Sequence, residues 1–122
     1  MKKILVVDDD PDFCELLKIR LEANGYDVIQ ASNGVAAFVK ANDEKPDLII
    51  LDVAMPIMDG LKFVQATRWQ IEMKDIPILI LSARTNTKEI FDDLGVANFL
   101  TKPFDPTELL ESVAECIKNS PG

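Results

Sequence analysis

The stretch Leu48-Ile49-Ile50-Leu51-Asp52, with the loop 53–60 behind it, decides how this chain folds. Four consecutive apolar residues without polar alternation predict a strand that is buried on both faces, as in the middle of a parallel sheet. The run ends at Asp52, and ligands of open α/β sheets collect beyond the carboxyl ends of the strands. Pro56 and Gly60 then interrupt regular structure. Taken alone, Asp52 is better explained as the cap of the next helix, so the functional argument depends on how the other strands end.

Length and composition indicate one folded domain. The chain has 122 residues, of which 48 % are apolar, and this is enough to build a sizeable core. No apolar run is long enough to span a membrane, and residues 1–7 are too short for a signal peptide. Two cysteines without a targeting segment favour a reducing cytoplasm.

The charge balance excludes several classes of function. A formal net charge of −8, from 13 basic and 21 acidic residues, argues against a nucleic-acid binder, which needs a basic face. The chain contains no histidine, the usual ligand of transition metals and the usual general base. A bound metal is therefore expected to be a hard cation held by carboxylates.

Strand-like and helix-like segments alternate five times along the chain. Besides residues 48–52, the pattern predicts strands at 4–7, 26–31, 77–81 and 98–101. Helices are predicted at 11–23, 35–42, from beyond Gly60 to about Trp69, at 85–94 and at 106–117. Their inward faces are assigned to residues at helical spacing, namely Phe13, Leu16, Leu17 and Leu21, then Phe38 and Val39, then Leu61, Val64 and Arg68, and last Leu109, Leu110, Val113 and Ile117. Trp69 is assigned to packing.

Such alternation, without hairpin turns, predicts a parallel sheet with helices on both faces. Five strands in this length fit the doubly wound α/β order 2-1-3-4-5, which is flavodoxin-like. The first and last predicted helices have clear start signals, Asp10-Pro11 and Asp105-Pro106 with Glu108. The domain is expected to cover residues 1–118, and 119–122 are read as a tail or a truncated linker.

Polar side chains end four of the predicted strands, and the strand order makes those ends neighbours. Asp8, Asp9 and Asp10 follow the first strand, Asp52 the third, Ser82 the fourth and Lys102 the fifth. Clustered carboxylates repel one another unless a cation compensates, and Mg²⁺ accepts one or two carboxylates together with phosphate. A hydroxyl and an ammonium group are suitable donors to phosphoryl oxygens. The combination predicts that Asp52 attacks phosphorus and becomes an aspartyl phosphate, while Asp10 is assigned to the cap of the first helix.

At this point the chain resembles the receiver domains of two-component response regulators, over nearly its whole length from Lys3 to Ile117. The resemblance depends on five matches taken together: ILVVDDD at 4–10, LDVAMPIMDG at 51–60, LSA at 81–83, Phe99, and LTKPF at 100–104.

The resemblance implies a role for each matching residue. Asp52 would accept a phosphoryl group from a histidine kinase or phosphotransfer protein, with Ser82 and Lys102 binding phosphoryl oxygens. Mg²⁺, with Mn²⁺ as the alternative, would be held by Asp8, Asp9, Asp52 and the backbone carbonyl of Ala54. The Lys102-Pro103 bond would be cis. Ser82 and Phe99 would form the switch, and the responding surface would be the fourth helix, fifth strand and fifth helix. A phosphorylation-dependent homodimer and an output domain stay open, and the domain would be a signalling module, not a turnover enzyme.

Three departures from the family pattern concern the surroundings of Asp52. Ala54 is smaller than the methionine often found there, and Arg84 could reach the space that it leaves. Both positions influence hydrolysis in the family. The segment from Ser82 to Phe99 is about two residues shorter than usual, so the fourth helix is expected to be short or shifted.

Three other classes of function remain as alternatives. A Mg²⁺-dependent phosphohydrolase of the haloacid dehalogenase type also uses an aspartate nucleophile, but it needs an acid two residues later, where this chain has Ala54. A receiver-like scaffold that works without phosphorylation is opposed by the complete residue set. A flavin or nucleotide binder is weaker still, because acidic residues and no glycine-rich loop follow Val7.

Overall fold

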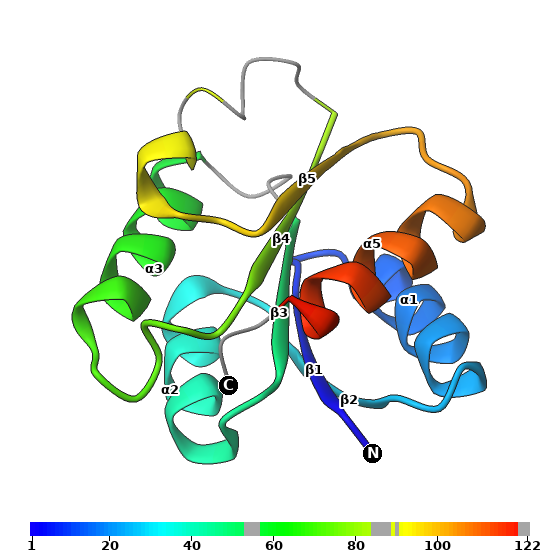
Figure 1. Cartoon of the computed structure of the whole chain (residues 1–122), viewed down its shortest axis with the longest axis horizontal. Helices are drawn as coiled ribbons and strands as arrows, with labels where there is room; N and C mark the ends of the chain where they lie inside the picture. Colours follow the sequence, from blue (N-terminus) through cyan, green and yellow to red (C-terminus); the bar gives the residue numbers. More distant parts are fainter. Residues whose placement is uncertain (53–56, 84–88, 90, 120–122) are drawn as a thin grey trace.

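The computed structural model of the chain describes residues 1–52, 57–83, 89 and 91–119, with the backbone alone at 57–59. Five parallel strands form one sheet in the order β2-β1-β3-β4-β5 (Figure 1). The strands are β1 (Lys3–Val7), β2 (Asp27–Ala31), β3 (Leu48–Asp52), β4 (Ile78–Ser82) and β5 (Asn98–Thr101). The predicted doubly wound, flavodoxin-like α/β fold is confirmed.

Helices cover both faces of this sheet. They are α1 (Pro11–Ala23), α2 (Gly34–Glu44), α3 (Ile57–Trp69), the short 3₁₀ helix η1 (Asp92–Leu94) and α5 (Pro106–Lys118). One core lies under α1 and α5, and the other lies under α2, α3 and η1 (Figure 1). Cys14 of α1 and Cys116 of α5 are buried free thiols in the first of these cores, as expected for helices on one face. None of the helices within the described ranges has both the length and the apolar character to cross a membrane.

Two predicted helices differ from the structure at their ends. α3 begins at Ile57, so Gly60 lies inside it and is buried, because tertiary packing outweighs the low helix propensity of one glycine. In the predicted helix 85–94, residues 85–88 and 90 lie outside the described residues. Its last residues, Asp92–Leu94, form a 3₁₀ turn, which ends at Gly95 with a φ of 67°.

Two apolar residues that were assigned to inward faces, and one that was assigned to packing, are exposed. Leu16 has 48 % of its surface exposed, Val39 52 % and Trp69 85 %. In α1 the buried stripe is Cys14, Leu17 and Leu21, and in α2 it is Ala37 and Ala41. A neighbour one or two positions away along a helix points 100° or 200° elsewhere, so these three predictions were wrong. Trp69 is the last residue of α3.

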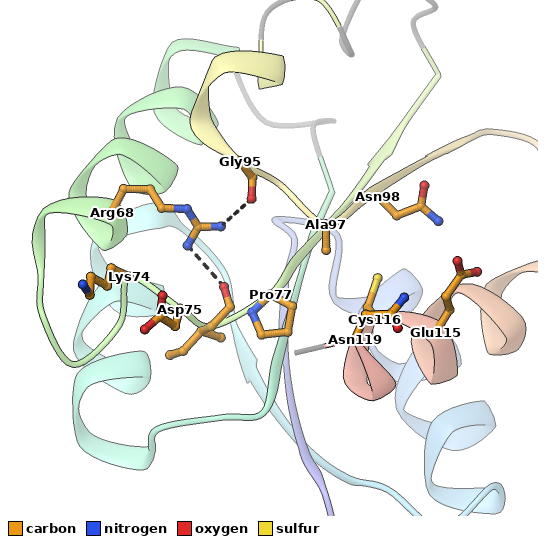
Figure 2. A pocket seen from close by; sticks show the side chains of 11 residues that line it. Arg68, Lys74, Asp75, Pro77, Gly95, Ala97, Asn98, Glu115, Cys116 and Asn119 are labelled. Carbon is orange, nitrogen blue, oxygen red and sulfur yellow. Dashed lines mark hydrogen bonds between the residues drawn. The ribbon is translucent and has the colours of Figure 1, made fainter. Parts of the chain in front are cut away.

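Arg68 connects the end of α3 to the starts of β4 and β5 (Figure 2). Its guanidinium donates to the carbonyl oxygens of Leu94 at 2.9 Å, Ile76 at 3.2 Å and Gly95 at 3.3 Å. A planar guanidinium presents several donors in a fixed arrangement, which suits three carbonyls that converge from separate segments. Arg68 therefore fixes the chain on either side of β4, at the end of the sheet opposite Asp52.

Candidate functional site

Asp52 lies at the carboxyl end of the central strand β3, and its side chain is only 1 % exposed. Val7 pairs with Leu51, and Asp52 pairs with Leu81, so β1, β3 and β4 end at the same level. The strands on both sides of β3 are buried as well. In β1 every residue after Lys3 is buried, and in β4 all five residues are. A polar group at this edge therefore lies at the carboxyl end of the sheet, where the sequence predicts the site.

Asp8 is the second buried carboxylate at this edge, with 2 % of its surface exposed. Its backbone N–H donates to the carbonyl of Ala31 at 3.1 Å, and its Oδ1 accepts from the N–H of Asp10 at 3.1 Å. Asp9 is exposed beside it. Asp10 caps α1, because its side chain accepts from the backbone N–H groups of Asp12 and Phe13. The assignment of Asp10 to the cap is confirmed.

Burial and the neighbouring Asp52 carboxylate together raise the pKa of Asp8 to about 7, although the hydrogen bond from the Asp10 N–H favours the ionised form. A carboxyl group at this pKa marks a place where negative charge lacks compensation. Such a place attracts a cation.

Lys102 supplies the positive charge of the site from the end of β5. Its Nζ forms an ion pair with Asp52 Oδ2, and its ammonium lies 4.3 Å from the centroid of the Phe13 ring. Its backbone N–H donates to the carbonyl of Ser82 at 2.8 Å, which extends the pairing of Ser82 with Thr101 by one residue. The Lys102-Pro103 bond is cis, as the resemblance implied.

The donor set fits Mg²⁺ in its chemistry. Within the described ranges, no group of three or more His, Cys, Asp or Glu side chains is arranged to hold a metal ion. Asp8 and Asp52 nevertheless form a pair of neighbouring buried carboxylates, and Mg²⁺ typically uses one or two carboxylates and keeps several waters. The exposed Asp9 adds a third acid next to this pair.

Of the remaining predicted site residues, two lie within the described residues and two lie outside them. Phe99 lies on β5, pairs with Ile80 and packs half-buried against the core under α2 and α3. Ser82 is buried at the end of β4. Ala54 and Arg84 lie outside the described residues, as do the last three positions of the predicted tail 119–122.

A polar hollow of about 390 Å³ lies at the opposite end of the strands (Figure 2). Its lining includes Arg68, Pro77, Asn98 and Glu115, and Arg68 already binds backbone carbonyls there. We place the functional site at the other end, where the buried carboxylates and the lysine meet.

Sequence reasoning missed one residue of the site. Phe13 was assigned only to the inward stripe of α1, whereas the structure places its ring against the Lys102 ammonium. The only available signal was an aromatic residue in the first turn of a helix that begins beside the acidic cluster. That signal does not identify the partner.

Comparison with known proteins bears on the family of this chain. The family model described as "Response regulator receiver domain" matches residues 4–114. The alkaline phosphatase synthesis transcriptional regulatory protein PhoP of Bacillus subtilis is 45 % identical over 98 % of this chain and 50 % of its own length. The structure of chemotaxis response regulator CheY4 of Vibrio cholerae is similar to this chain, with 37 % sequence identity and a TM-score of 0.87. The superposition covers 95 % of this chain and 98 % of the CheY4 chain.

A second solved structure is also similar to this chain. Response regulator protein TrrA of Thermotoga maritima, solved in complex with Mg(2+)-BeF, is 36 % identical with a TM-score of 0.84 and covers 95 % of this chain and 99 % of that one. The chain spans about half the length of the curated relatives that it matches. From the family match, these identities and the strand order, the chain belongs to the receiver domains of two-component response regulators, which signal by phosphorylation.

Proposed function

We propose that Asp52 is the phosphoacceptor of this receiver domain and takes its phosphoryl group from a phosphohistidine of a partner kinase or phosphotransfer protein. The observation that carries the proposal is the ion pair between Lys102 and the buried Asp52, beside a second buried carboxylate, Asp8.

The transfer forms one bond and breaks one. A carboxylate oxygen of Asp52 attacks phosphorus, and the phosphorus–nitrogen bond of the phosphohistidine breaks. The electron pair of that bond stays on the imidazole nitrogen of the partner. Acetyl phosphate replaces this donor in the test below, with the phosphorus–oxygen bond breaking and acetate leaving. Donors and cations around the transferring group stabilise the charge on its oxygens.

Asp8 and Asp52 would hold Mg²⁺, with Asp9 and the carbonyl of Ala54 as the further ligands that the family resemblance implies. The cation supplies charge neutralisation between carboxylates and phosphoryl oxygens. The hydrogen bond from the Asp10 N–H orients the Asp8 carboxylate. Lys102 then exchanges its contact with Asp52 for a phosphoryl oxygen, and Ser82 donates to another.

The signal is proposed to pass through Ser82 and Phe99 to the surface that includes β5 and α5. A closely packed interior favours two discrete arrangements over a continuous drift, so a movement of Ser82 is transmitted to its neighbours on β5. The domain is proposed to end with α5 at Lys118. It signals and does not turn over a substrate. Its longer relative PhoP of Bacillus subtilis is a transcriptional regulatory protein.

Labelling with acetyl phosphate tests this proposal. We expect one phosphoryl group per chain, on Asp52, only when Mg²⁺ is present, and none on Asp52→Asn. Asp12→Asn, an exposed acid in the first turn of α1, is the matched control and should be labelled like the wild type. Mass spectrometry that locates the label elsewhere, or a wild type that takes up no label, would contradict the assignment and favour a scaffold. Rapid multiple turnover of acetyl phosphate would favour the phosphohydrolase.

A further inference from the structure

The Lys102 ammonium has two neighbours of different kinds. On one side it forms the ion pair with Asp52, and on the other it lies 4.3 Å from the centroid of the Phe13 ring. A cation within about 6 Å of a ring centroid is attracted by the negative face of the ring. The lysine side chain is 26 % exposed, so water reaches its remaining surface.

The start of α1 fixes the position of that ring. Asp10 accepts from the backbone N–H of Phe13 at 3.3 Å, and Pro11 occupies the beginning of the helix. Phe13 is half-buried and packs against the core under α1 and α5. The backbone that carries the ring is therefore held by the same turn that follows the acidic residues of the site.

The backbone of Lys102 is fixed as well, by its N–H bond to Ser82. The flexible four-carbon side chain of Lys102 can still point either to the site or to solvent. Ordering such a side chain costs conformational entropy. The side chain lies along an apolar hollow of about 470 Å³, which Phe13, Leu17, Phe104 and Leu109 help to line. The aromatic face at one end of this hollow provides a contact for the ammonium that does not depend on Asp52.

The geometry points to Phe13 as a positioning residue for Lys102: its ring keeps the ammonium over the site when the Asp52 carboxylate is converted into the phosphoryl ester. This inference rests on the proposed function. Phe13 does not touch the transferring group, and it acts by reducing the number of orientations open to the lysine.

Binding of beryllofluoride in saturating Mg²⁺ and the rate of labelling by acetyl phosphate measure this role. Phe13→Leu keeps an apolar side chain and loses the ring, and we expect both quantities to fall about threefold to tenfold. Mg²⁺ affinity should stay within error of the wild type, and any fall in the urea midpoint should match that of Phe104→Leu, since Phe104 packs against the same core. Phe13→Tyr restores a ring and should restore both quantities. Phe104→Leu, which removes an aromatic residue from the same hollow, is the matched control and should change them less than twofold.

Two further measurements do not depend on labelling. The methylene protons next to Nζ of Lys102 should show an upfield ring-current shift in NMR spectra, which disappears in Phe13→Leu and persists in Phe13→Tyr. Replacement of Phe13 by pentafluorophenylalanine keeps the shape and reverses the charge of the ring face, so it should weaken beryllofluoride binding as Phe13→Leu does.

The outcomes separate the inference from the proposed function. If the wild type is labelled on Asp52 and Phe13→Leu binds beryllofluoride equally well, the positioning role is wrong while the phosphoacceptor stands. An unshifted Lys102 resonance in the wild type also overturns the role. If the wild type takes up no label, the proposed function fails and takes the inference with it.

Discussion

Replacing Asp8 with asparagine should make the metal-free protein more stable and less able to bind Mg²⁺. Asp8 is 2 % exposed, and burial together with the Asp52 carboxylate raises its pKa from 3.8 to about 7. The folded protein therefore resists ionising this group. Asparagine keeps an oxygen that can accept from the Asp10 N–H and carries no charge, so the variant removes the cost and retains the hydrogen bond.

The size of the effect follows from the pKa. Each unit of difference between the pKa of Asp8 in the folded and in the unfolded state corresponds to about 1.36 kcal/mol. Ionising Asp8 therefore lowers the free energy of unfolding by about 4 kcal/mol at alkaline pH. Below the unfolded pKa of 3.8 both states are protonated and Asp8 contributes nothing. Because the unfolded chain loses the proton first, stability falls as pH rises from about 4 to about 7, and then levels off.

Urea unfolding in EDTA at pH 4.5 and pH 8.5 measures this difference. We expect Asp8→Asn to raise the free energy of unfolding by about 3–4 kcal/mol at pH 8.5 and by about 1 kcal/mol at pH 4.5. Glu111→Gln removes an exposed negative charge from α5 and should change stability by less than about 0.5 kcal/mol at either pH.

Mg²⁺ provides the second half of the test. A cation at one hundred times its Kd should stabilise the wild type by about 2.7 kcal/mol, and it should stabilise Asp8→Asn much less. The reasoning is refuted if Asp8→Asn is no more stable than the wild type at pH 8.5, or if the gain is the same at both pH values.

Three further predictions concern the rest of the molecule. Arg68→Ala removes the donor to three carbonyls and should lower the free energy of unfolding in urea by about 2–4 kcal/mol. Arg20→Ala, on the exposed side of α1, should lower it by less than about 0.5 kcal/mol, and equal losses would contradict the role of Arg68. Burial raises the pKa of Cys14 and of Cys116 to about 11, so both thiols should react slowly with a thiol reagent at pH 8 in the folded protein and completely in urea. Fewer than two free thiols on denaturation under anaerobic conditions would indicate a disulfide. Ser82→Ala should keep Mg²⁺ binding and some labelling but lose most of the beryllofluoride-induced change in amide exchange over residues 91–118, and an undiminished change would exclude this route.

Much of the site could be predicted because a parallel sheet converts sequence order into spatial proximity. The continuous apolar runs identify the buried strands, and the residue after each run must lie at the same edge of the sheet as its counterparts. Asp8, Asp52, Ser82 and Lys102 were found in this way, and the structure places all four at the carboxyl ends of neighbouring strands. The caps of α1 and α5 were equally local, since Asp10 and Asp105 bind backbone groups two or three residues away.

The exact width of the buried face of each helix could not be predicted. Helical spacing identifies residues that share a face, but it does not say where that face ends, so Leu16 and Val39 were wrongly assigned to the interior and Trp69 to packing.

The sequence by itself determined the element order, the strand order and the set of chemical groups, because these depend on local patterns and on one rule of sheet geometry. Only the tertiary structure decided that Asp8 and Asp52 are buried together, which sets the pKa of Asp8. It also decided that the ring of Phe13 meets the ammonium of Lys102. The physical reason is that burial and charge contacts depend on which segments approach each other in space, and no local pattern records the distance between a helix start and the end of a strand far along the chain.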